Sequence, residues 1–86
     1  MYYVYVIQSE KYGKSYTGLT GNLEKRIKEH NSGYTKSIKP FIPYILIYHE
    51  TVPDLMLARK REKYLKSAAG RNFVKKVLEE NLKNKE

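Results

Sequence analysis

The chain has 86 residues and a formal net charge of +8, from 17 lysine and arginine residues against 9 aspartate and glutamate residues. This length provides for one small domain with a single hydrophobic core. The absence of cysteine excludes disulfide bonds, a thiolate zinc site and a cysteine nucleophile. The positive charge favours a polyanionic partner, nucleic acid before an anionic membrane surface.

The sequence contains no recognisable targeting or membrane-spanning segment. Its start has no basic region ahead of a long apolar run, as a signal peptide would have. No apolar run approaches the roughly 20 residues that span a bilayer. We therefore expect a cytoplasmic protein that does not associate with membranes.

The first half of the chain predicts a β-hairpin followed by a helix. Aromatic and β-branched residues from Tyr2 to Ile7 indicate a strand covered on both faces, and Ser15 to Leu19 returns beside it after a polar loop containing Gly13. Asn22 is a good N-cap for a helix that reaches about Asn31, and Gly33 suits its C-terminal cap.

The second half predicts a third strand and two more helices. Residues 34–43 are basic and irregular, since Pro40 and Pro43 exclude a regular helix there. A strand at 45–49 follows, and then Asp54 caps a helix that reaches about Lys66. The segment 68–70 reads as a break before a last helix from about Arg71, whose apolar stripe is Phe73, Val74, Val77 and Leu78.

These elements define an α+β fold in the order β-β-α-β-α-α, a small three-stranded antiparallel sheet flanked by helices. We expect a single domain over residues 1–80 and a charged, frayed tail over 81–86.

Two polar side chains fall on the predicted packing face of the first helix. At about 100° per residue, Arg26 and His30 share the edge of the face that carries Leu23 and Ile27. Polar groups are costly in that position. We interpret them as converging with tyrosines from the strands on a phosphate.

The second predicted helix carries an acid in its apolar stripe, because Glu62 lies between Leu55 and Ala58 on the helical wheel. An unpaired carboxylate there would cost several kcal/mol or bind a proton. Three arrangements avoid that cost: a salt bridge with Arg26 as the obvious partner, a metal ion, or a place at the rim of the core. Magnesium tolerates so sparse a ligand set, since it keeps several waters and takes other ligands from phosphates.

Together these residues resemble the GIY-YIG nuclease domain family over nearly the whole chain. The two half-motifs are Tyr3-Val4-Tyr5 and Tyr16-Thr17-Gly18, followed by Arg26 and His30 on a helix. The glutamate context of the family matches Ala58, Glu62, Leu65 and Lys66, and Asn72 fits a later polar position. Tyr3 replaces the family's Gly and Thr17 replaces its Ile, which we interpret as variation outside the chemistry.

The resemblance implies hydrolysis of phosphodiester bonds with one divalent metal ion, Mg²⁺ or Mn²⁺, held by Glu62. Arg26 would donate hydrogen bonds to the transition state, and Tyr16 would position the water or a phosphate oxygen. Tyr5 would be the base, helped by Lys14 or His30, and His30 could instead relay its proton. Asn72 is either a supporting residue or a helix cap.

Basic residues outside this set could contact a nucleic-acid backbone. Lys36 and Lys39 precede the third strand, and Arg59 and Lys63 lie on the second predicted helix, with Lys75 and Lys76 further on. Contacts of this kind give affinity without sequence readout. The alternative is that these residues only keep the protein soluble.

The sequence thus predicts a metal-dependent endonuclease, with DNA favoured over RNA, in repair, recombination or restriction-like processing. A protein partner could supply its specificity. The alternative is a non-catalytic nucleic-acid-binding module on the same scaffold.

Overall fold

The computed structural model describes residues 1–34, 36 and 38–84. The elements in chain order are β1 (Tyr2–Ser9), β2 (Ser15–Thr20), α1 (Leu23–Asn31), a 3-10 turn (Lys39–Phe41), β3 (Tyr44–Val52), α2 (Leu55–Lys66) and α3 (Ala68–Asn84). The α+β class and the order β-β-α-β-α-α are confirmed.

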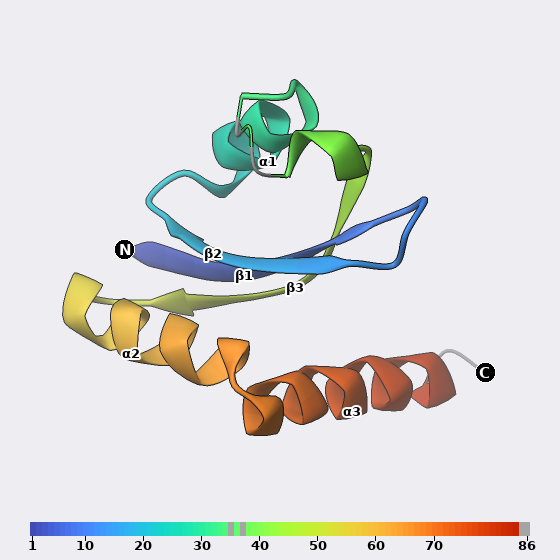
Figure 1. Cartoon of the computed structure of the whole chain (residues 1–86). Coiled ribbons are helices and arrows are strands. Elements are labelled where there is room, and N and C mark those ends of the chain that lie inside the picture. The colour runs from blue at the N-terminus through green and yellow to red at the C-terminus, as the bar shows by residue number, and fades with distance from the viewer. Residues whose placement is uncertain (35, 37, 85–86) are drawn as a thin grey trace.

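The sheet is antiparallel and places β1 in the centre, in the order β2-β1-β3. Helix α1 covers one face, whereas α2 and α3 lie along the other (Figure 1). Because side chains alternate along a strand, Val4 and Val6 join the core with Ala58 of α2, while Tyr5 and Ile7 belong to a second core on the α1 side. The expectation that the first strand is covered on both faces is therefore confirmed.

The predicted helix caps are present. The side chain of Asn22 accepts a hydrogen bond from the Lys25 amide at 3.1 Å, and that of Asp54 accepts one from the Leu57 amide at 2.9 Å. Gly33 follows α1 with a φ of +84°, a conformation in which glycine is strongly favoured. These local signals fix where α1 and α2 begin and where the chain leaves α1.

The predicted break at 68–70 was wrong, because α3 begins at Ala68 and Ser67 alone separates it from α2. Gly70 is buried in the first turn of α3. A Cβ at this position would collide with the carbonyl oxygen of Tyr64 and with the backbone of Leu65. The glycine permits the close approach of two helices and does not interrupt one.

Two other boundaries differ from the expectation. Strand β3 extends to both sides of the predicted 45–49, because its full length pairs with β1. Helix α3 continues to Asn84, into the segment expected to fray, and residues 85–86 of that tail lie outside the described part. Within the described residues, no helix combines the length and the apolar character needed to cross a membrane.

Replacing Gly70 with alanine tests the helix junction. Alanine gains about 1 kcal/mol in helix propensity, but overpacking against backbone costs up to about 3 kcal/mol. We expect Gly70→Ala to lower the free energy of unfolding in urea by about 2 kcal/mol. Gly21→Ala is the control, because a Cβ there meets nothing within 4 Å. Equal stability of the two variants would contradict the close approach.

Candidate active site

Tyr5 lies at the centre of the site and packs directly on a glycine. Tyr5 of β1 and Gly18 of β2 are cross-strand partners. A Cβ at Gly18 would run into the hydroxyl and ring of Tyr5. The glycine of the second half-motif is thus required by contact, since any larger residue would displace the Tyr5 ring.

The Tyr5 hydroxyl joins the sheet to helix α1 through His30. The distance from the Tyr5 hydroxyl oxygen to His30 Nε2 is 2.7 Å, and neither residue is more than 1% exposed. Tyr16 of β2 packs its ring against the same imidazole, with centroids 5.1 Å apart and planes at 62°. Two strands and one helix therefore meet at a single histidine.

Arg26 lies one helical turn before His30 and reaches the rim of the same cluster. Its side chain is 29% exposed, and Nη1 lies 3.5 Å from Glu29 Oε1. Burial alone would lower the pKa of Arg26, but interactions with the Tyr5 hydroxyl and Glu29 outweigh burial and raise it. Arg26 is therefore a permanent cation beside the tyrosine.

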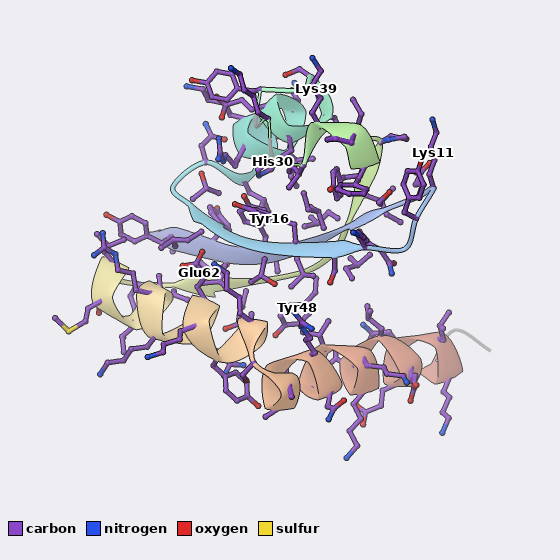
Figure 2. All side chains as sticks on the ribbon, viewed as in Figure 1. Lys11, Tyr16, His30, Lys39, Tyr48 and Glu62 are labelled. Carbon is purple, nitrogen blue, oxygen red and sulfur yellow. The ribbon has the colours of Figure 1, made fainter. Side chains whose placement is uncertain are left out.

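Glu62 approaches from α2, on the other side of the sheet. Its side chain is 25% exposed, and the nearest cation is Lys66, with Nζ 3.6 Å from Oε2. Of the three arrangements considered for Glu62, the salt bridge with Arg26 does not form, because Arg26 pairs with Glu29, and the partly exposed carboxylate of Glu62 lies at the rim. Figure 2 shows Glu62 on α2, with Tyr16 between it and His30 in this view.

Three side chains predicted for the site act on the hydroxyl of a fourth, Tyr5. Burial raises the pKa of Tyr5 to about 12, with further contributions from Tyr16 and from the negative charge of Glu62, while Arg26 lowers it. Tyr16, Arg26 and Glu62 therefore each lie within electrostatic reach of the Tyr5 hydroxyl. The same burial, together with the charge of Arg26, lowers the pKa of His30. At neutral pH the pair is a protonated phenol beside a neutral imidazole.

The donor set fits a hydrated divalent cation. No cluster of three or more histidine, aspartate or glutamate side chains occurs among the described residues, so a fully protein-bound metal has no cage there. Glu62 offers a partly exposed carboxylate whose one ion pair among the described residues is with Lys66. One carboxylate completed by waters and phosphate oxygens is a normal arrangement for Mg²⁺.

Lys14 and Asn72 do not join this cluster. The ammonium group of Lys14 lies over the ring of Phe41, 4.5 Å from its centroid, at the hairpin end of the sheet. Asn72 is exposed inside α3, beyond its first turn, so it is not a cap. The described structure places neither beside Tyr5.

The predicted backbone contacts form two groups on opposite sides of the sheet. Lys36 and Lys39 lie on the α1 side, and Figure 2 shows Lys39 beyond His30 as seen from Tyr16. Arg59 and Lys63 project from α2, and all four are exposed. Residue 37, inside the basic segment 36–39, lies outside the described part.

Glu29 and Lys66 restrain Arg26 and Glu62 but were not singled out in advance as their ion-pair partners. Both pairs follow helical spacing, three residues for Arg26 and Glu29 and four for Glu62 and Lys66. Side chains at these spacings are neighbours on a helix surface. The signal was therefore present in the sequence.

Comparison with known proteins identifies the family. The model of the GIY-YIG catalytic domain matches residues 1–76. A UPF0213 protein of Desulfotalea psychrophila is 41% identical over 70 residues, 76% of this chain and 60% of that protein. One of Clostridium perfringens is 36% identical over 84 residues, 96% of this chain and 89% of that protein.

A baculovirus relative extends the range of organisms. A UPF0213 protein of Autographa californica nuclear polyhedrosis virus is 32% identical over 77 residues, 87% of this chain and 73% of that protein. No solved structure matches this chain significantly.

The fold and the matching model define a nuclease-type domain. The chain belongs to the GIY-YIG family, and its relatives are UPF0213 proteins, which are stand-alone GIY-YIG domain proteins.

The lowered pKa of His30 predicts a pH dependence of stability. In the unfolded chain His30 has a pKa of about 6.5. In the folded chain the same imidazole binds a proton less readily. Between the two values the unfolded state therefore binds more protons, so stability falls as pH drops below about 6.5. We expect urea unfolding at pH 7.5 and 5.5 to show this loss, and His30→Gln to reduce it.

His49→Gln is the matched control. It removes the same imidazole ring, but from an exposed position on β3. An unchanged pH dependence in His30→Gln would contradict a buried neutral imidazole.

Proposed function

We propose that this protein is a metal-dependent endonuclease that hydrolyses phosphodiester bonds in DNA, in repair, recombination or restriction-like processing. The observation that supports this most directly is the grouping of Tyr16, Arg26 and Glu62 around Tyr5, from three separate elements. Membership of a nuclease-type family supports the reaction class.

Arg26 and Tyr16 are the groups proposed to contact the scissile phosphate. Both are partly exposed, whereas Tyr5 is 1% exposed. Negative charge grows on the phosphoryl oxygens in the transition state, and a guanidinium can donate two hydrogen bonds to them. The Tyr16 hydroxyl would orient the attacking water or one phosphate oxygen.

Tyr5 and His30 are proposed to take the proton from the attacking water. A phenol with a pKa of about 12 is a poor base as an isolated group at neutral pH. Its hydroxyl, however, can donate to a neutral imidazole at 2.7 Å. Tyr5 can then accept a proton from water while it passes its own to His30. Because Tyr5 is buried, the water would reach it beside Tyr16.

Glu62 would hold the divalent ion, Mg²⁺ or Mn²⁺. When bound there, such an ion would provide Lewis-acid chemistry for phosphodiester hydrolysis. The contribution of the chain is to place one carboxylate, paired with Lys66 at 3.6 Å, within electrostatic reach of Tyr5. Affinity for metal without substrate should be weak, because the described residues offer no larger ligand cluster.

Exposed basic residues are proposed to bind the DNA backbone on either side of the site, and the group comprises Lys36, Lys39, Arg59 and Lys63. Contacts of this kind release counterions, so binding should weaken steeply with salt. They carry no sequence information, and a protein partner would provide specificity.

Cleavage of nicked, flapped and branched DNA with Mg²⁺ or Mn²⁺ tests the function. We expect Glu62→Gln and Arg26→Ala each to lower the cleavage rate by about 10²- to 10³-fold, as for loss of one preorganised transition-state contact. Glu79→Gln removes an exposed carboxylate of α3 and should cleave like the wild type.

Equal cleavage by the wild type, Glu62→Gln and Arg26→Ala would identify a contaminating nuclease and overturn the assignment. Salt-sensitive DNA binding that survives Glu62→Gln, without turnover under either metal, would favour a non-catalytic binding module.

A further inference from the structure

A groove on the opposite face of the sheet from Tyr16 is not used by the proposed chemistry. It has a volume of about 360 Å³ and runs between the β1–β2 hairpin and α3. Its floor is apolar and buried, formed by Val6, Leu65 and Val74. Cavities of this size take small organic ligands.

The walls of the groove combine hydroxyl groups with cations. Ser15 and Thr17 of β2 line one side, and Arg71 and Lys75 of α3 line the other. None of the described residues lining it is acidic, and neither Arg71 nor Lys75 forms an ion pair within the described part of the chain. An apolar floor beneath two uncompensated cations is complementary to a flat ring that carries an anion.

Thr17 joins this groove to the candidate active site. Successive residues of a strand point to opposite faces, so Tyr16 packs against His30 while Thr17, paired with Val6, faces the groove. Strand β2 is an edge strand, and a flexible nucleic-acid strand can pass around it. The departure from the isoleucine of the family therefore places a small polar side chain in the groove wall.

We propose that this groove binds one nucleotide of the substrate next to the cleaved linkage, which rests on the proposed function. The base lies on the apolar floor with its polar edge toward Thr17, and its phosphate contacts Arg71 and Lys75. A second copy of this chain is a poorer occupant, because two molecules of charge +8 repel each other.

Titration of the isotope-labelled full chain with deoxyadenosine 5′-monophosphate, without metal, tests the groove by amide NMR shifts. We expect shifts at Thr17, Arg71 and Lys75. Lys75→Gln should weaken binding by about tenfold, as for loss of one charge-assisted hydrogen bond. Lys76→Gln is the matched control, since Lys76 is adjacent to Lys75 in the sequence but does not line the groove.

Thr17→Ile should fill the groove and abolish the shifts at Arg71 and Lys75. If this variant does not fold, the affinities of Lys75→Gln and Lys76→Gln for the nucleotide still test whether the groove binds it. Identical shifts with inorganic phosphate alone, equal affinities of the two lysine variants, or concentration-dependent shifts without nucleotide would each overturn the proposal.

The result is separable from the proposed function. Glu62→Gln should bind the nucleotide as the wild type does. If the wild-type protein binds the nucleotide but cleaves no DNA, the proposed endonuclease activity is overturned and the proposed nucleotide site stands. In an active enzyme, Thr17→Ile should raise KM about tenfold with kcat nearly unchanged, as for uniform binding. Loss of kcat alone would contradict a binding role.

Discussion

The contact of the Tyr5 ring with the backbone at Gly18 is the constraint on which the site depends. It leaves no room for a side chain on β2 at that point and turns the phenol toward α1. The hydroxyl then meets His30 at 2.7 Å inside the core. A buried hydroxyl and a buried imidazole satisfy each other, whereas either alone would cost free energy. This contact therefore fixes the orientation of α1 about its own axis. Arg26, one helical turn before His30, then lies at the rim of the cluster around Tyr5.

The second constraint is that the site draws on both faces of the sheet. Arg26 and His30 come from α1, while Glu62 comes from α2 on the far side. Helix α2 is anchored away from the site by Arg61, whose Nε donates to Glu50 Oε1 on β3 at 2.5 Å. Arg61 also lies over the rings of Tyr64 and Phe73, at 4.8 and 5.2 Å from their centroids. This network fixes the helix that carries Glu62.

Local signals predicted the fold well because most elements begin and end at residues with short-range roles. Asn22, Asp54 and Gly33 act within their own turns, so their chemistry is visible without tertiary structure. Gly70 looked like a breaker by the same reasoning. Its actual role depends on the Tyr64 carbonyl oxygen, a contact made only when two helices meet.

The site was harder to predict, since helical periodicity gives direction but not distance. It placed Arg26 and His30 at the edge of the packing face, and it placed Glu62 inside the apolar stripe of its helix, with the rim of the core as one of three alternatives. It could not show that Arg26 would form its ion pair with Glu29, three residues away, and not with Glu62 on another helix. Lys14 was a reasonable neighbour for Tyr5 by charge, but the hairpin carries it to Phe41 instead.

The central claim is that Glu62, Arg26 and Tyr16 share one spot able to hold a divalent ion against a phosphate. Mn²⁺ is paramagnetic and broadens the NMR signals of nearby amides, which makes it a direct probe of this geometry. In the wild-type protein, low Mn²⁺ concentrations should broaden the amides around Tyr16, Arg26 and Glu62 together, and Glu62→Gln should remove all three effects. Broadening confined to the acidic residues of α3, or unchanged by Glu62→Gln, would contradict the account.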